Sequence, residues 1–126
     1  KAVNIEMLTA LEMSKQEILP ACLEYTKFVV DDVAKKAEIG IKVPHEKAQA
    51  EELSALTEKL IEKTAALDAV AAAVPTEGTA LEVATYYKDN ALPAMDEVRA
   101  VADNLETIVA KEYWPFPTYT DLLYYI

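Results

Sequence analysis

Only two of the 126 residues are glycine, Gly40 and Gly78. A β-fold of this length needs many tight turns, and few residues other than glycine adopt the backbone conformations of those turns easily. Alanine, leucine, glutamate and lysine, which are strong helix formers, are abundant instead. The chain is therefore predicted to belong to the all-α class.

A heptad of apolar residues makes the segment 45–74 the clearest predicted helix. Its apolar positions fall seven residues apart, with two more on the same side: Leu53, Leu60, Leu67, Val74, Leu56 and Val70. Charged residues fill the other positions, as they do on the solvated face of an amphipathic helix. Pro75 and Gly78 supply the stop signal that ends such a helix.

Segments 3–39 and 79–111 carry apolar residues at three- and four-residue steps, which is the spacing of one helical face. In segment 3–39 the predicted stripe, with one gap at Lys15, is Leu8, Leu11, Ile18, Cys22, Tyr25, Val29 and Val33. In segment 79–111 it is Ala91, Met95, Val98, Ala102, Leu105 and Val109. Gly40 and Pro44 end the earlier of the two segments.

Pro20 and Pro93 lie inside these two segments. An internal proline removes a backbone hydrogen bond and clashes with the carbonyl four residues earlier, so a kink or a break is predicted at each. The segments also share five identities at an offset of 73 residues, which either an internal repeat or their common richness in alanine and leucine explains. The matched pairs are Lys15 with Lys88, Leu19 with Leu92, Pro20 with Pro93, Ala21 with Ala94, and Glu24 with Glu97.

Three long helices joined by short connections predict an up-down-up antiparallel bundle, with residues 1–126 forming a single domain. None of the three apolar stripes is wide enough to stabilise its helix in isolation, so packing between the helices must do so.

Residues 112–126 form an aromatic tail. Pro115 and Pro117 prevent a continuing helix and favour an extended path. So much apolar surface is predicted to fold back on the bundle or to dock on another surface. The candidate docking residues are Trp114, Phe116, Tyr119, Leu122 and Leu123.

The formal net charge of −10 argues against a partner that is a nucleic acid or an anionic membrane, since both attract basic surfaces. No stretch approaches the roughly 20 apolar residues that span a bilayer, and no signal-peptide pattern is present. A single cysteine, Cys22, excludes an internal disulfide and fits a reducing cytoplasm. Lys1 in place of an initiator methionine indicates a fragment or a processed product.

No catalytic, cofactor-binding or metal-ligating residue is assigned. The one histidine, His45, follows a proline in a predicted turn, and the Glu-x-x-His motif of helical di-metal sites is absent. Cys22 falls on the apolar stripe and is predicted to be a buried, inert thiol. Two isolated glycines do not make a phosphate-binding loop. The neighbouring carboxylates, predicted to lie on a solvated face, are Glu51, Glu52, Glu58 and Glu62.

The sequence Lys-Glu-Tyr-Trp-Pro-Phe-Pro-Thr-Tyr-Thr-Asp-Leu-Leu, at 111–123, closely resembles the C-terminus of type III glutamine synthetases. The run 86–106, which begins Tyr-Tyr-Lys-Asp-Asn-Ala-Leu-Pro, is similar to the helix that precedes it in that family. The segment 17–25 is similar to the first helix of the same region. The resemblance covers most of the chain and is strongest from Tyr86 to Leu123.

This resemblance implies a parent enzyme that ligates ammonia to glutamate through a γ-glutamyl phosphate, using ATP and a divalent metal, Mg²⁺ or Mn²⁺. It implies that the present chain is a non-catalytic helical domain whose partners are the catalytic domain and neighbouring subunits of a double-ringed oligomer. No ATP, metal or glutamate ligand of the family is carried over to a residue here, and self-association of the chain is left open. The alternatives are a free-standing helical adaptor that binds a protein partner and, less favoured for want of histidines, a helical enzyme in its own right.

Overall fold

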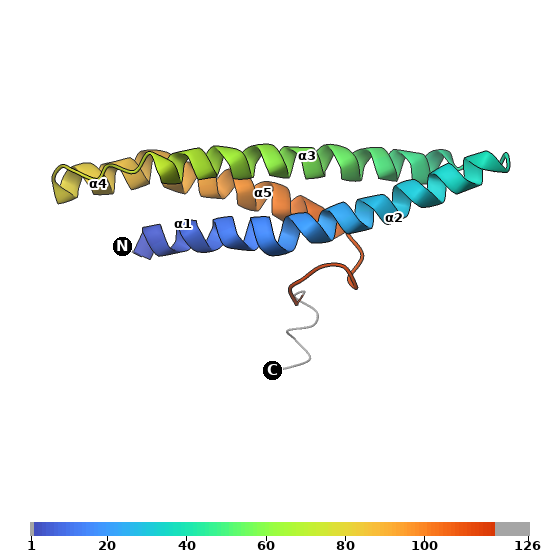
Figure 1. Ribbon diagram of the computed structural model, residues 1–126, viewed down its shortest axis with the longest axis horizontal. Coiled ribbons are helices and arrows are strands. Elements are labelled where there is room, and N and C mark those ends of the chain that lie inside the picture. The colour runs from blue at the N-terminus through green and yellow to red at the C-terminus, as the bar shows by residue number, and fades with distance from the viewer. Residues whose placement is uncertain (1, 118–126) are drawn as a thin grey trace.

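The computed structural model describes residues 2–117, and within that range the chain contains helices and turns but no strand. The predicted all-helical class with three long helical rods is confirmed (Figure 1). The elements are α1 (Ala2–Met13), η1 (Ser14–Ile18) and α2 (Leu19–Glu38) in the first rod, α3 (Pro44–Ala72) as the second, and α4 (Ala80–Tyr86), η2 (Tyr87–Ala91) and α5 (Leu92–Ile108) in the third.

The second rod, α3, is the central helix of the fold. It packs against α2 along one side and α5 along another, and it also contacts α1 and η2. In Figure 1 the first rod and α3 meet at one end through the turn 39–43, while α4 and α3 meet at the other. None of the helices among residues 2–117 combines the length and apolarity that crossing a bilayer requires.

The chain passes both internal prolines without a break. Each proline is the second residue of an α-helix that directly follows a five-residue π-helical turn, η1 or η2. In each wide turn a backbone N–H bonds to the carbonyl five residues earlier, from Leu19 to Ser14 and from Leu92 to Tyr87. The wider turn accommodates a residue that has no N–H and a ring that crowds the preceding turn. The two turns are 73 residues apart, so the same Leu-Pro sequence gives the same local geometry twice.

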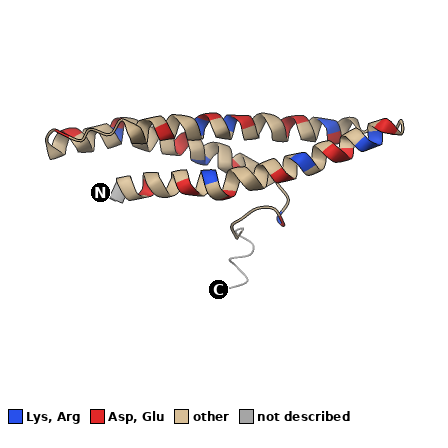
Figure 2. Cartoon of the chain, viewed as in Figure 1, with Lys and Arg blue, Asp and Glu red and all other residues tan. Residues whose placement is uncertain are grey.

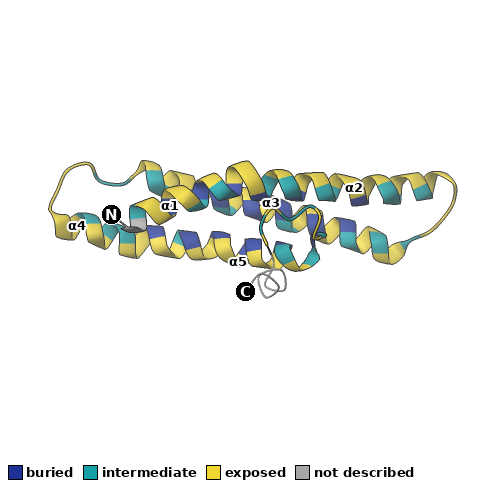
Figure 3. Ribbon diagram, turned by 90° about the horizontal axis from the view of Figure 1, so that it is seen from below, coloured by how far each residue is buried: buried dark blue, intermediate teal, exposed yellow. Residues whose placement is uncertain are grey.

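The leucine heptad of α3 is confirmed as the core stripe. The buried residues of α3 follow alternating steps of three and four: Ala50, Leu53, Thr57, Leu60, Thr64 and Leu67. Every residue of the predicted 79–111 stripe is buried as well. Figure 3 shows the buried positions on the sides of the helices that face one another. Val74 lies beyond the end of α3 and is half-buried, packed against the core.

The predicted stripe of the first rod is wrong at one position. Leu8 is 52% exposed, whereas its neighbour Met7 is 1% exposed. The extra residue in η1 rotates α1 by about 100° relative to an uninterrupted helix, because each residue of an α-helix advances by that angle. That rotation turns Leu8 outward and brings Ser14 into the gap that the pattern left at Lys15.

Polar residues occupy three buried positions of the core in the part of the chain that the structure describes. Ser14 Oγ and Thr64 Oγ1 are 2.7 Å apart and share a hydrogen bond between the first rod and α3. The buried Thr57 hydroxyl has no hydrogen-bond partner within residues 2–117. Thr57 and Thr64 occupy equivalent heptad positions, so these two hydroxyls differ mainly in whether a partner reaches them.

Candidate functional site

The segment after α5 returns to the bundle at its aromatic residues. The backbone leaves the helical conformation at Val109 and turns sharply, with the N–H groups of Tyr113 and Trp114 both donating to the carbonyl of Ala110. The Tyr113 ring then lies 5.0 Å from that of Tyr25 and 6.2 Å from that of Phe28, centroid to centroid. Such tilted aromatic contacts are favourable, so this cluster ties the segment to α2.

Trp114 and Phe116 cover a cavity of about 370 Å³ between the first rod and α5. Both side chains are half-buried and pack against the hydrophobic core. The walls are mainly apolar and include Met13, Ile18, Met95 and Val98; Arg99, Asp103 and Glu106 also line the cavity. The other candidate docking residues, Tyr119, Leu122 and Leu123, lie outside the described residues.

The cysteine prediction is confirmed in its burial. Cys22 has no exposed surface, and burial raises the pKa of its thiol from 9.0 to about 11. The thiolate, which is the nucleophilic form, is therefore disfavoured at neutral pH.

The remaining candidates lie in solvent. His45 is exposed in the first turn of α3, next to Pro44. The four neighbouring carboxylates of α3 are exposed, as predicted for a solvated face: Glu51, Glu52, Glu58 and Glu62.

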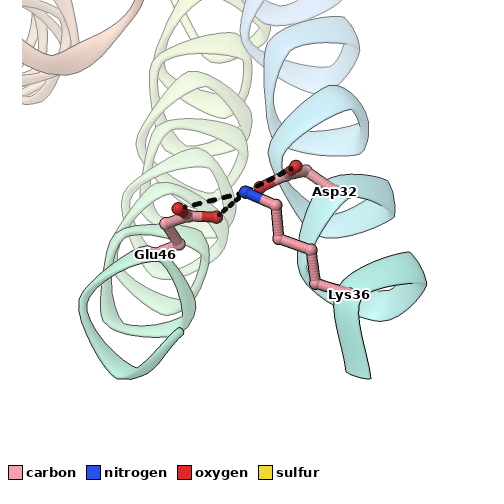
Figure 4. A network of polar contacts seen from close by, with 3 residues as sticks. All are labelled: Asp32, Lys36 and Glu46. Carbon is pink, nitrogen blue, oxygen red and sulfur yellow. Dashed lines mark hydrogen bonds and ion pairs between the residues drawn. The ribbon is translucent and has the colours of Figure 1, made fainter. Parts of the chain in front are cut away.

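Among residues 2–117, three ion-pair sites connect the rods, and sequence reasoning missed all of them. The ammonium of Lys36 lies 3.2 Å from Asp32 Oδ1 on its own helix and 2.9 Å from Glu46 Oε1 on α3 (Figure 4). The hydrogen bonds that the Lys36 ammonium donates, first to Glu46 and then to Asp32, raise the pKa of Lys36. Lys15 pairs with Asp68 at 2.6 Å, and Lys63 pairs with Glu97 at 2.9 Å.

Sequence spacing reveals only the contact between Asp32 and Lys36, which are four residues apart on one helix. The pairs between rods depend on how the helices align. Figure 2 shows why charge alone does not single them out, because acidic and basic residues are spread along all three rods.

Residues 2–117 contain neither a cluster of metal-ligating side chains nor a glycine-rich loop. No group of three or more His, Cys, Asp or Glu side chains within residues 2–117 is arranged to hold a metal ion. The two glycines lie in separate turns, at the two opposite ends of α3, so they do not combine into a loop that surrounds phosphate.

Comparisons with known proteins decide the relationship. The chain is 31% identical to a glutamine synthetase from Butyrivibrio fibrisolvens over an alignment of 134 residues that covers 98% of this chain. It is 26% identical to a type-3 glutamine synthetase from Dictyostelium discoideum, again over 98% of this chain. The resemblance to type III glutamine synthetases is confirmed.

The similarity concerns part of these glutamine synthetases. The chain spans only 18% of the length of each of these two relatives. No protein-family model matches the chain, and no solved structure matches it. The described residues of this glutamine synthetase-like chain contain a packed helical core and a docked aromatic segment.

Proposed function

We propose that this chain is a non-catalytic assembly domain from the C-terminal part of a cytoplasmic type III glutamine synthetase. In this proposal its three rods form an up-down-up bundle, slightly bent at Pro20 and Pro93, that braces the catalytic domain and neighbouring subunits. The observation that carries the proposal is similarity to two glutamine synthetases along 98% of this chain and 18% of each relative. The core of the bundle, closed by aliphatic side chains, supports a structural role.

The parent enzyme of this proposal ligates ammonia to glutamate at the expense of ATP, with Mg²⁺ or Mn²⁺ bound elsewhere in the protein. The contribution of this chain is mechanical. Ion pairs from Lys15, Lys36 and Lys63 join α3 to the first and third rods, and the Trp114 segment rests across the first rod and α5. A bundle restrained in this way can hold the catalytic domain and neighbouring subunits in fixed relative positions, and this role requires no active site.

Calorimetry on the 126-residue chain tests the absence of catalysis. Titration with ATP in the presence of Mg²⁺ is expected to give no binding heat, and an ammonia-ligation assay is expected to give no product. Stoichiometric ATP binding by this chain would contradict the proposal. A positive control is the full-length enzyme, which should bind ATP in the same buffer.

Deletion from the full-length enzyme tests the bracing role. Removing this region is expected to reduce the assembly to smaller species in sedimentation velocity. An assembly of unchanged size would show that the bundle braces nothing.

A free-standing adaptor is the second candidate, and exposed apolar side chains favour it. Ile39, Leu81 and Phe28 are each more than half exposed, as expected of surfaces that meet a partner. The reading frame upstream of Lys1 separates the two candidates. An encoded catalytic domain there supports the assembly domain, whereas a start codon at that point supports the adaptor.

A further inference from the structure

The α2–α3 hairpin extends beyond the third rod. In Figures 1 and 3, α5 ends near the middle of the molecule, while α2 and α3 continue as a pair to the turn 39–43. The rest of the bundle has three rods around its core, but this end has two. A pair of amphipathic helices leaves one apolar side uncovered unless a further element packs on it.

The uncovered side is hollowed into a groove, here named the tip groove. It consists of two adjoining cavities of about 440 and 330 Å³ that share Val33 and Lys47. All of the lining residues fall between positions 30 and 54, so no residue of α1 or α5 borders it. The apolar lining consists of Val30, Val33, Ala34, Ala37, Ile41, Val43, Pro44 and Ala50.

On its α3 side the rim of the tip groove carries two opposite charges one turn apart, and a further cation, Lys42, lines the groove at the turn 39–43. Lys47 and Glu51 both lie on α3 and both line the groove. Within residues 2–117 neither side chain has an ion-pair or hydrogen-bond partner, in contrast to Lys36 and Glu46 nearby, which pair with each other. On α3 the groove therefore offers an apolar floor with an unpaired cation, Lys47, and an unpaired anion, Glu51, beside it.

We propose that the tip groove receives the tip groove of a second copy of this chain. A two-fold axis perpendicular to α3 makes the two copies of this helix antiparallel. Lys47 of each copy then faces Glu51 of the other, which meets the requirement that an isologous interface be self-complementary. Two hairpins packed in this way form a four-helix bundle. The alanines of the floor allow close approach of the helix backbones.

The charges favour a second copy over an unrelated helix. A partner helix with flanks of a single sign would pair with only one of the two rim residues and repel the other. The tip groove of a second copy, rotated by the two-fold axis, pairs with both Lys47 and Glu51. This inference rests on the proposed function only in placing the dimer within a larger enzyme. The dimer contact itself involves residues of this chain alone.

Sedimentation equilibrium on the 126-residue chain tests the proposal, with circular dichroism to check that each variant is folded. The wild-type chain is expected to form a concentration-dependent dimer. Lys47→Glu places two like charges on the rim and breaks both symmetric pairs, so the dimer dissociation constant should rise by about tenfold. Lys47→Glu/Glu51→Lys exchanges the charges and should restore dimerisation to near the wild-type level.

Two further variants define the location of the interface. Val33→Asp, at the junction of the two cavities, should abolish the dimer. Lys59→Glu, an exposed charge reversal elsewhere on α3, should leave it unchanged.

Three results would overturn the proposal. A folded chain that stays monomeric at every concentration has no such interface. A dimer that Val33→Asp leaves intact is formed elsewhere. A double exchange that fails to restore pairing shows that the opposing surface is not this groove. None of these results affects the proposed assembly role, which the ATP titration and the deletion from the full-length enzyme test separately.

Discussion

Ser14 Oγ and Thr64 Oγ1 share a hydrogen bond of 2.7 Å in the buried core between the first rod and α3. Both side chains are buried, so each hydroxyl depends on the other for its satisfaction. This reciprocity makes the cost of removing one hydroxyl different from the cost of removing both.

Thr64→Val is expected to destabilise the chain by about 1–3 kcal/mol, because it leaves the Ser14 hydroxyl buried without its partner. Adding Ser14→Ala should recover much of that loss, since the unsatisfied group is then gone. Urea unfolding followed by circular dichroism measures both values. Equal and additive losses in a double-mutant cycle would mean that the two hydroxyls do not interact.

Thr57→Val, the same substitution two helical turns away, is expected to have the opposite sign. The Thr57 hydroxyl is buried without a partner in the part of the chain described, so replacing it with a methyl group removes a desolvation cost. A gain of about 1 kcal/mol in the free energy of unfolding is expected. Thr64→Val serves as the matched comparison, and a loss of stability in both variants would contradict this account.

Trp114→Ala is expected to lower the melting temperature, because the ring covers the cavity between the first rod and α5. The free energy of unfolding should fall by on the order of 2 kcal/mol, as expected when a half-buried aromatic side chain is removed. Differential scanning calorimetry measures it, with Leu81→Ala as the control at an exposed apolar position. A truncation after Lys111 should lower the melting temperature further, and unchanged melting would show that the segment adds nothing to the fold.

Alkaline pH is expected to weaken the fold through Cys22. Burial raises the pKa of this thiol to about 11 in the folded chain, above its value of 9.0 without burial. The stability that the neutral Cys22 thiol contributes is therefore fully present below about pH 9. It is lost as the pH rises toward 11, and the free energy of unfolding falls by at most about 3 kcal/mol. Unfolding free energies of the wild type and Cys22→Ala, compared across that interval, isolate the effect. Parallel curves for the two chains would exclude it.

Much of the fold was predictable because it depends on local spacing. The seven-residue recurrence from Leu53 to Leu67 predicted the core face of α3, and Gly40 with Pro44 marked the turn that separates α2 from α3. These signals act within one helix or one turn, so they can be recognised in the sequence without knowing which helices pack together.

The features that were missed depend on geometry between elements or on an irregular turn. Regular spacing placed Leu8 on the core face, because it takes no account of the extra residue that the wide turn beside Pro20 absorbs. The pairing of Lys36 with Glu46 depends on how α2 and α3 align across the turn 39–43, which spacing within one helix does not reveal. Composition singled out the aromatic segment, but the path of its residues 112–117 against the bundle follows from the turn at Ala110.

The wide turns η1 and η2 have a consequence for how this chain tolerates changes in length. Each contains one residue more than an ordinary helical turn, so losing a residue such as Gln16 would convert η1 to regular helix while Met7 and Leu11 kept their orientation toward α3. The drawback is local, since the Pro20 ring would then press on the carbonyl one turn before it. Gaps of one residue between homologous chains should therefore collect at these two places, where the hydrophobic faces on either side stay in phase.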